Sequence, residues 1–276
     1  MGPSVGSMSA TTTRVHVVTG AGGGIGRAIV ERLAAGGDAV VALDRDADAL
    51  AALAGSVGSV GTVGTVVPLA GDAGDEAVAE RAADLAAEAG VLAGWVNNAA
   101  VFRDASVHVD GAGTVLRLVT ANLGLALAGC ATAVRRFLAA GTPGAIVNVS
   151  SHQARQAVPG ATPYATAKAG IEGLTRALAV EYGPRGIRVN AVAPGSVDTE
   201  RYAGLLAAQP GEGAERIRRL MAEVHPLGRV ARAGEVAAAV AWLLSDDAGF
   251  VNGATLPVDG GRSVLARDPE AQGISP

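Results

Sequence analysis

The sequence predicts an α/β protein in which a doubly wound parallel sheet carries helices on both faces. Three observations predict this fold. Short runs rich in valine, isoleucine and alanine alternate with longer segments whose apolar residues recur at helical spacing. The short runs are apolar throughout, as in parallel strands that are buried on both faces. A glycine-rich turn separates the first strand-like run from the first helix-like segment.

The first two elements show the pattern most clearly. The run Arg14–Thr19 is β-branched, and the helix-like segment Ile25–Ala35 repeats apolar residues at Ile25, Ile29 and Leu33. Similar apolar runs predict further strands at Ala39–Leu43, Thr65–Leu69, Ala93–Val96, Ala145–Val149, Ile187–Ala191 and Thr255–Val258. Helical patterns between these strands predict helices at Ala47–Ala54, Glu76–Ala89, 112–140, 163–182 and Val236–Leu244.

Two segments depart from this alternation. Residues 55–64 repeat glycine, serine, threonine and valine, and we expect a surface loop or a loose strand extension there. Residues 198–232 mix charged residues, proline and glycine with short apolar runs, which is typical of a lid over a site. No boundary divides residues 13–262, so we expect one domain between an N-terminal lead, 1–12, and a C-terminal tail, 263–276.

Composition narrows the classes of partner. The 276 residues carry a net charge of −4, so no broad basic surface for nucleic acid is expected. The uncharged run 118–134 is too short to span a membrane, and the N-terminus lacks the pattern of a secretory signal. The 4 histidines show no metal-ligand spacing, which predicts no metal site. Cys130, Trp95 and Trp242 are expected in the core, and the whole favours a cytoplasmic location.

The glycine-rich turn has the composition of a phosphate-binding loop. It places Gly20, Gly23, Gly24, Ile25 and Gly26 between a strand and a helix. Glycines let backbone N–H groups approach a pyrophosphate, and the helix N-terminus supplies partial positive charge. The sequence therefore predicts a single-domain Rossmann-type fold with a dinucleotide site. A plain tight turn is the alternative reading of the same residues.

The end of the second strand bears on the choice of dinucleotide. Asp44 follows the glycine turn by about twenty residues, where a carboxylate accepts hydrogen bonds from the adenosine ribose and repels a 2′-phosphate. No basic residue occupies position 23 to offset that repulsion. These features favour NAD over NADP. Arg45 offers a cation that could reach a 2′-phosphate, and a helix cap is the alternative role of Asp44.

Tyr164 and Lys168 form the second candidate constellation. They are four residues apart in a helical pattern, so they share one face of the helix. A nearby ammonium favours the phenolate and lowers the pKa of a tyrosine, which prepares the phenol for proton exchange with an alcohol or carbonyl. Lys168 is the only lysine in the chain. A solvated surface pair is therefore a weaker explanation here than in a lysine-rich protein.

With these residues in view, the chain resembles the short-chain dehydrogenase/reductase family over residues 13–262. The likeness rests on a series of motifs in the family's order. They are Thr19-Gly20-x-x-x-Gly24-Ile25-Gly26, Asp72, Asn97-Asn98-Ala99-Ala100, Asn122, Ser150-Ser151, Tyr164-x-x-x-Lys168, Pro194-Gly195-Ser196-Val197-Asp198-Thr199 and Val258-Asp259-Gly260-Gly261. The family more often has glycine at the position of Ala100.

The resemblance implies a catalytic tetrad of Asn122, Ser151, Tyr164 and Lys168. In that tetrad Tyr164 is the acid/base, and Ser151 stabilises charge on the substrate oxygen. Lys168 is implied to bind the nicotinamide ribose and to lower the pKa of Tyr164. Asn122 is implied to hold a water in a proton relay with Lys168; a core amide with an internal partner is the alternative.

The resemblance also implies which residues surround NAD. Asp72 is implied to contact the adenine amino group, and a helix cap is its alternative role. The full set is Gly20, Gly23, Gly24, Ile25, Gly26, Asp44, Arg45, Asp72, Ala73, Asn98, Ala99, Ala100, Tyr164, Lys168, Pro194, Gly195, Val197 and Thr199.

Substrate recognition is predicted from position alone. Ser151 and the polar residues after it, His152, Gln153 and Arg155, lie near the expected reaction site, with Arg155 suited to an acidic group. A solvated loop is the alternative for the last three. Further residues considered at the pocket edge are Phe102, Arg103, Arg201 and His225. The last two fall in the expected lid, where a solvated position is favoured.

Together these features predict an NAD-dependent oxidoreductase that moves a hydride between nicotinamide and a secondary alcohol or ketone, such as a polyol, sugar or hydroxy acid. Two alternatives stay open: an NADPH-dependent 3-oxoacyl-thioester ketoreductase and a non-catalytic dinucleotide sensor. An epimerase or dehydratase would need a different lid. The resemblance further implies a homodimer or homotetramer that pairs through helices 112–140 and 163–182, with the last helix and strand as a second contact.

Overall fold

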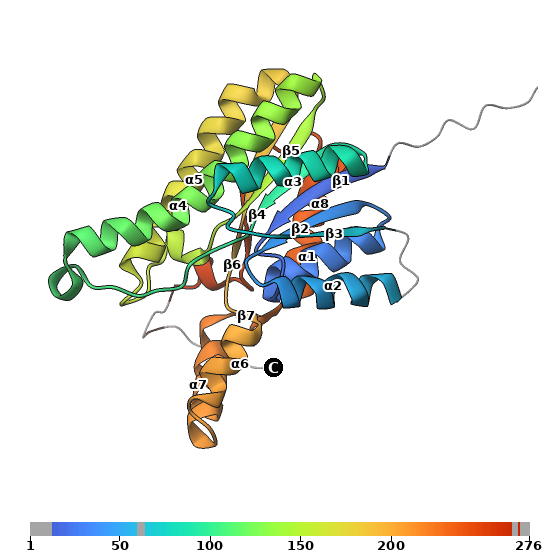
Figure 1. The fold of residues 1–276 in the computed structure, drawn as a ribbon. Helices are drawn as coiled ribbons and strands as arrows, with labels where there is room; N and C mark the ends of the chain where they lie inside the picture. Colours follow the sequence, from blue (N-terminus) through green and yellow to red (C-terminus); the bar gives the residue numbers. More distant parts are fainter. Residues whose placement is uncertain (1–12, 60–63, 267–269, 271–276) are drawn as a thin grey trace, which may run out of the picture.

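Seven parallel strands form the central sheet of the computed structural model, which describes residues 13–59, 64–266 and 270 (Figure 1). The strands lie in the order β3-β2-β1-β4-β5-β6-β9. Their bounds are β1 Arg14–Thr19, β2 Ala39–Asp44, β3 Val66–Ala70, β4 Val91–Asn97, β5 Gly144–Val149, β6 Ile187–Pro194 and β9 Thr255–Val258. The predicted doubly wound α/β fold is confirmed, with strands up to three residues longer than expected.

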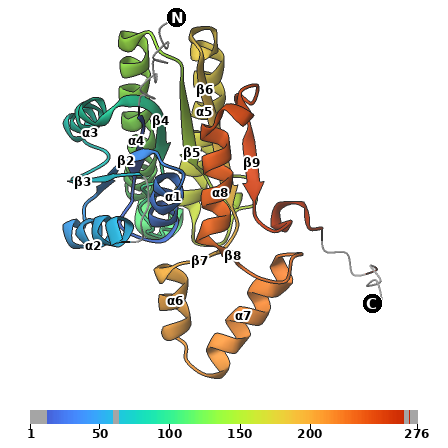
Figure 2. The ribbon, with the colours of Figure 1, turned by 90° about the vertical axis from the view of Figure 1, so that its right-hand side faces the viewer.

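Helices cover both faces of this sheet (Figures 1 and 2). On one face, α1 (Gly24–Ala35), α2 (Ala47–Ser59) and α8 (Ala233–Leu244) close a core that includes Ile29, Leu53 and Leu243. On the other face lie α3 (Glu76–Ala89), α4 (Val107–Ala140) and α5 (Thr162–Tyr182). Their core includes the side chains of Trp95, Phe137 and Ile146, each 1% exposed or less. Both faces are therefore apolar, as the uninterrupted apolar runs predict.

The order of the strands fixes where a ligand can bind. The chain runs outward from β1 to β2 and β3, and then returns to pair β4 with the opposite edge of β1. Helices that follow these strands diverge to opposite faces at that point and leave a crevice at the carboxyl ends of the strands. The glycine turn after β1 and the polar residues after β4, β5 and β6 all reach this edge.

The helix α4 is longer than the sequence pattern suggests. It begins at Val107. Its first turn is separated from the rest of the helix by Gly111, whose φ of +76° is outside the helical region. By length and composition α4 is the one helix of the described residues that could cross a membrane. Its side chains from Asn122 to Phe137 are largely buried against α5, α3 and β4, as in the core helix of a globular domain.

Residues 198–232 form a separate pair of helices beyond the carboxyl edge of the sheet (Figure 2). They comprise α6 (Glu200–Ala207) and α7 (Glu212–Val224), tied to the domain by a short parallel pair, β7 (Val197–Asp198) with β8 (Ala231–Arg232). Only Ala214 of the two helices is buried. We call residues 198–232 the lid from here on.

The structure differs from the expectations for residues 55–59 and Trp242 and agrees with those for Trp95 and Cys130. The helix α2 continues through residues 55–59, where a loop or strand extension was expected, because that stretch supplies Val57 to the core; residues 60–63 lie outside the described part. Trp242 was expected in the core but is 42% exposed. Trp95 and Cys130 are buried as predicted, and burial raises the pKa of the Cys130 thiol to about 12. The predicted C-terminal tail, 263–276, begins within a 3₁₀ turn, Arg262–Val264. The predicted N-terminal lead, 1–12, lies outside the described residues.

Candidate active site

The glycine turn makes room for a ligand through its backbone. A Cβ atom at Gly20, whose φ is +65°, would lie 2.8 Å from the Cα of Ala99, and one at Gly26 would lie 1.9 Å from the carbonyl oxygen of Gly20. Both positions therefore require glycine. The amide of Asn98 donates to the carbonyl oxygens of Thr19 and Gly20 at 3.1 and 2.9 Å. This clamp fixes the turn against the end of β4.

The carboxylate of Asp44 is held at the mouth of this turn. One oxygen accepts from the backbone N–H of Gly22 at 2.9 Å, and the other accepts from that of Asp46 at 3.1 Å. The guanidinium of Arg45 turns away and pairs with Asp72. A hydrogen bond from the Gly74 N–H is the largest influence on the pKa of Asp72, which is lowered in spite of partial burial, and the bond from Arg45 lowers it further. The helix cap of α3 is Asp75, not Asp72.

A cavity of about 710 Å³ runs from the glycine turn to the ends of β5 and β6. It brings together most of the residues that the sequence predicts. They are Gly20, Gly23, Gly24, Ile25, Asp44, Asn98, Ala99, Ala100, Ser151, His152, Gln153, Tyr164, Lys168, Pro194, Gly195, Val197 and Thr199. Arg45, Asp72 and Ala73 line a smaller adjoining cavity of about 130 Å³ that shares Asp44. Gly26, Asn122, Arg103 and Arg155 line neither cavity.

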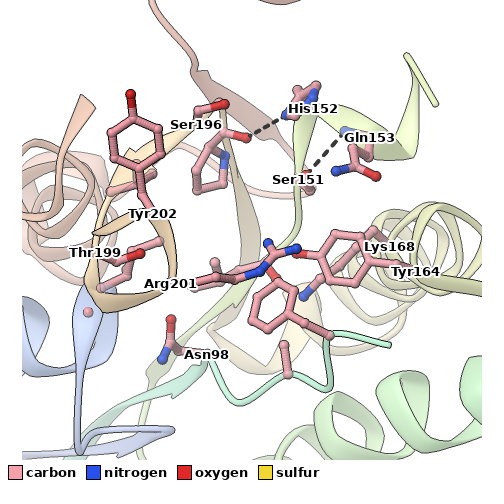
Figure 3. A pocket seen from close by; sticks show the side chains of 18 of the residues that line it. Asn98, Ser151, His152, Gln153, Tyr164, Lys168, Ser196, Thr199, Arg201 and Tyr202 are labelled. Carbon is pink, nitrogen blue, oxygen red and sulfur yellow. Dashed lines mark hydrogen bonds between the residues drawn. The ribbon is translucent and has the colours of Figure 1, made fainter. Parts of the chain in front are cut away.

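Ser151, Tyr164 and Lys168 lie near one another in the lining of the larger cavity (Figure 3). Ser151 follows β5, and its hydroxyl accepts from the backbone N–H of Gln153 at 3.2 Å. The hydroxyl of the preceding Ser150 is directed elsewhere, since it contacts the carbonyl oxygen of Lys168 and the carboxylate of Glu172 at 3.3 Å. The geometry thus favours Ser151 over Ser150 as the group that faces a substrate.

The environment of Tyr164 differs from the simple expectation for a tyrosine beside a lysine. The Nζ of Lys168 lies 5.3 Å from the centre of the Tyr164 ring and donates to the carbonyl oxygen of Val149 at 2.7 Å. Burial raises the pKa of Tyr164 to about 12, while Arg201 and the Ser151 hydroxyl oppose that rise. Burial also lowers the pKa of Lys168 to about 8. In this structure desolvation raises the pKa of Tyr164, whereas the sequence predicts that the nearby Lys168 lowers it.

Asn122 is buried and lies outside the lining of the cavity. Its amide accepts from the N–H of Val101 at 2.9 Å and donates to the carbonyl oxygen of Val101 at 3.0 Å. A third bond joins it to the carbonyl oxygen of Leu118. Asn122 therefore anchors the segment after β4 to α4, and its predicted part in a proton relay stays a prediction.

The residues after Ser151 divide into two groups. The ring of His152 is buried and contacts the carbonyl oxygen of Pro194 at 3.3 Å, and burial and the nearby Arg262 lower its pKa to about 4. The Nε2 of His152 and the Oε1 of Gln153 are buried with no hydrogen-bond partner among the described residues, and their predicted part in substrate binding stays a prediction. Arg155 instead pairs with the buried Glu172 at 3.1 Å. Its predicted role toward an acidic substrate group is therefore not supported by its position.

Several cavity residues were undervalued by the sequence pattern. Phe102, expected only as a possible edge residue, lies with its ring centre 5.2 Å from that of Tyr164. Arg201 extends from α6 and places its guanidinium carbon 4.2 Å from the centre of the Phe102 ring (Figure 3). Glu200 and Arg262 also line the cavity. Glu200 directly follows the motif that ends at Thr199, and Arg262 directly follows the motif that ends at Gly261. These positions in the sequence could have indicated that both residues lie near the cavity.

His225 was expected to be solvated but is 2% exposed. Its Nε2 accepts from the backbone N–H of Ser196 at 3.1 Å, and its Nδ1 donates to the carbonyl oxygen of Met221 at 2.6 Å. These two bonds require the neutral ring with the proton on Nδ1. The histidine therefore joins the end of α7 to the segment that follows β6, and it serves as an anchor of the lid.

Comparisons with known proteins show which family and fold the chain resembles. A family model described as enoyl-(acyl carrier protein) reductase matches residues 20–263. The cis-4-hydroxycyclohexanecarboxylate dehydrogenase of Sinomonas cyclohexanicum is 43% identical over 257 residues, which is 91% of this chain and 97% of that protein. The crystal structure of a levodione reductase is similar with a TM-score of 0.82 and 34% identity, covering 92% of this chain and 98% of that chain.

A third likeness concerns the cofactor. The structure of a candidate 2-deoxy-D-gluconate 3-dehydrogenase from Agrobacterium tumefaciens, with bound NADP, is similar with a TM-score of 0.78. It is 32% identical and covers 91% of this chain and 97% of that chain. The likenesses extend over nearly the whole chain, so they bear on the fold and on the cavity alike.

Proposed function

The chain belongs to the short-chain dehydrogenase/reductase family, whose members are NAD(P)-dependent oxidoreductases of CH–OH groups, and we propose that it uses NAD to interconvert a secondary alcohol and a ketone. The observation that carries the choice of NAD is the arrangement of Asp44 and Arg45. The Asp44 carboxylate faces the cavity beside the glycine turn, whereas the Arg45 guanidinium is engaged with Asp72.

The glycine turn fits a dinucleotide. Gly20 and Gly26 leave no room for a side chain and keep the backbone N–H groups at the start of α1 open to a pyrophosphate. Asp44 is placed to accept hydrogen bonds from ribose hydroxyls and to repel a 2′-phosphate. When bound, the nicotinamide accepts or supplies the hydride.

The protein's own part in the reaction concerns the proton and the developing charge. Ser151 would donate a hydrogen bond to the substrate oxygen and steady its negative charge. Tyr164 would exchange a proton with that oxygen through its hydroxyl. Since burial holds the pKa of Tyr164 near 12, the phenol is protonated at neutral pH, which suits ketone reduction. Alcohol oxidation needs the phenolate and should gain from alkaline pH, assisted by the charge of Arg201 and the hydrogen bond to Ser151.

The substrate class stays broad at this stage. A polyol, a sugar or a hydroxy acid fits the predicted chemistry, and relatives act by name on cyclic alcohols and ketones. The NADP bound to a similar structure favours NADP as the cofactor, and it keeps open the alternative of an NADPH-dependent 3-oxoacyl-thioester ketoreductase. Preference for NADP would decide between the two.

We also propose that the protein is a homo-oligomer that pairs through α4 and α5. Apolar side chains on these helices are exposed in the single chain, among them Leu116 and Leu127 of α4 and Val180 of α5. A second copy would cover them. The mass in solution tests this proposal.

The proposed reaction is tested by following NADH formation at alkaline pH with secondary alcohols, including polyols, sugars and 4-hydroxycyclohexanecarboxylate. We expect turnover with NAD, weak turnover with NADP, and a loss of about a thousandfold in kcat for Tyr164→Phe with NADH binding unchanged. Equal turnover by Tyr164→Phe would overturn the acid/base assignment. A preference for NADP would overturn the role given to Asp44.

A further inference from the structure

The charged side chains that line the large cavity are divided between its two ends. The carboxylates of Asp44 and Glu200 lie at the glycine turn: Asp44 bonds the Gly22 N–H, and Glu200 comes within 3.5 Å of where a Cβ on Gly23 would stand. The cations Lys168, Arg201 and Arg262 lie in the rest of the cavity lining. The end of the cavity where the reaction is proposed is therefore positively charged.

Two of these three cations already have partners. Lys168 donates to the carbonyl oxygen of Val149, and Arg262 donates to the Ser196 hydroxyl at 3.0 Å and is influenced by the charge of Asp259. Arg201 differs from both. Within the described part of the chain its only recorded contact is the face of the Phe102 ring, and no carboxylate pairs with it.

The stacked position leaves Arg201 ready to bind an anion. A guanidinium that lies over an aromatic face is held by cation–π attraction, while its N–H groups point outward along its edge. Those N–H groups form a planar fork that matches a carboxylate with two parallel hydrogen bonds. The ring of Phe102 thus orients Arg201 without using its donors.

The same ring sets the distance between Arg201 and the reacting group. The Phe102 ring contacts both groups: its centre lies 4.2 Å from the guanidinium carbon of Arg201 and 5.2 Å from the centre of the Tyr164 ring. Arg201 is also close enough for its charge to act on the Tyr164 hydroxyl. A small substrate whose alcohol reaches Tyr164 can therefore reach Arg201 with a second group of the same molecule.

Resting on the proposed function, we propose that the substrate is a hydroxy acid or keto acid whose carboxylate binds the guanidinium of Arg201. The lid residue Arg201 thereby selects anionic substrates, while Ser151 and Tyr164 act on the oxygen at the other end of the molecule. NAD strengthens this selection, since its oxidised nicotinamide would bring one more positive charge into the same half of the cavity. The neutral His152 and Gln153 remain for uncharged polar atoms of the substrate.

Binding is measured first in Tyr164→Phe saturated with NADH, so that the result does not depend on turnover. The probes are cyclohexanecarboxylate and its carboxamide, which have one ring and no reacting hydroxyl, titrated by calorimetry. We expect the carboxylate to bind at least tenfold more tightly than the carboxamide, and Arg201→Gln in the same background to remove that difference. Arg216→Gln, an exposed arginine of the same lid that does not line the cavity, is the matched control and should keep it.

Turnover is then compared for 4-hydroxycyclohexanecarboxylate and its methyl ester. Arg201→Gln should raise KM for the acid by about 10-fold to 100-fold and leave KM for the ester within about twofold, with Arg201→Lys in between. Equal binding of carboxylate and carboxamide by the protein with Arg201 intact overturns the proposal. A raised Kd for NADH in Arg201→Gln, with the carboxylate preference intact, overturns it as well, because the cation then serves the cofactor. Failure of the proposed reaction is recognised separately, as absent turnover with carboxylate binding preserved.

Discussion

The floor of the cavity, where the reaction is proposed, and the lid above it are built in opposite ways. The floor, Ser151, Tyr164 and Lys168, sits on the end of β5 and the start of α5, with Ser151 and Lys168 only 6% and 2% exposed. The lid contributes Arg201 from an exposed helix of eight residues, joined to the domain by a two-residue strand pair. Floor residues are fixed by the main core, and lid residues by few contacts.

This difference separates chemistry from selection. A group that must exchange a proton needs a constant position and a dry environment, which the floor supplies. A group that chooses among substrates can sit on a movable element that closes over whichever molecule has bound. Changes in the floor should therefore affect every substrate alike, whereas changes in the lid should affect substrates or cofactor selectively.

The largest effect is expected for Lys168→Met. It should lower kcat about a thousandfold for every substrate, since Lys168 is the implied ribose and proton-transfer partner of Tyr164. It should also stabilise the protein, because burial lowers the pKa of Lys168 from 10.5 to about 8 and so disfavours the folded state when that lysine is charged. The free energy of unfolding at pH 7 should rise by up to about 3 kcal/mol.

The pH dependence of that gain has a definite sign. Below pH 8 both states of the wild type hold the proton, and the full destabilisation is present. Between pH 8 and 10.5 the unfolded chain keeps the proton that the folded chain has released, so wild-type stability rises with pH relative to Lys168→Met. Urea unfolding of both proteins at pH 7 and 9.5 measures this. A gap that widens with pH would contradict the assignment.

A medium effect, on stability alone, is expected for Arg155→Gln. The change leaves the buried carboxylate of Glu172 with the Ser150 hydroxyl as its remaining recorded partner, so the free energy of unfolding should fall by about 1–2 kcal/mol. Arg176→Gln removes an exposed arginine of α5, the helix that carries Glu172, and should have little effect. The KM for hydroxy acids should be unchanged by Arg155→Gln, and a rise similar to that of Arg201→Gln would return Arg155 to the substrate site.

The floor could be predicted from the sequence because its information is local. Tyr164 and Lys168 share a helix face by spacing alone, and Asp44 and Asn98 reach the cavity because they lie at the carboxyl ends of β2 and β4, the parallel strands on either side of β1. Gly20 and Gly26 were recognised for the same reason, since a close backbone approach leaves a direct mark on composition. Short-range patterns of this kind can be recognised in the sequence without knowledge of the packing.

The features that were missed depend on partners far apart in the chain. Arg45 bonds Asp72, and Arg155 bonds Glu172, although each arginine looks free in the sequence. His225 looks like a lid residue but is buried against Ser196, 29 positions away. The raised pKa of Tyr164 follows from the burial of its phenol, which no spacing reveals. Tertiary packing decides such cases.

The smallest effect, and the sharpest test of the lid, is expected for Glu200→Gln. Its carboxylate lies within 3.5 Å of the Cβ positions of Gly23 and Gly24, where the start of α1 is proposed to hold the pyrophosphate. Removing this like charge should lower the Kd for NADH about twofold to fourfold at low ionic strength, and salt should reduce the difference. Glu212→Gln, an exposed change on α7, serves as the control.

Fluorescence titration with NADH measures both variants. If Glu200→Gln lowers the Kd for NADH, the first turn of α6 acts on both halves of the cavity, because Glu200 and Arg201 are adjacent. The carboxylate of Glu200 acts on the cofactor, and the guanidinium of Arg201 acts on the substrate. The acid-to-ester preference should therefore be the same in Glu200→Gln and the wild type. An unchanged Kd for NADH together with an altered preference would place Glu200 with the substrate and remove the division of the lid into a cofactor half and a substrate half.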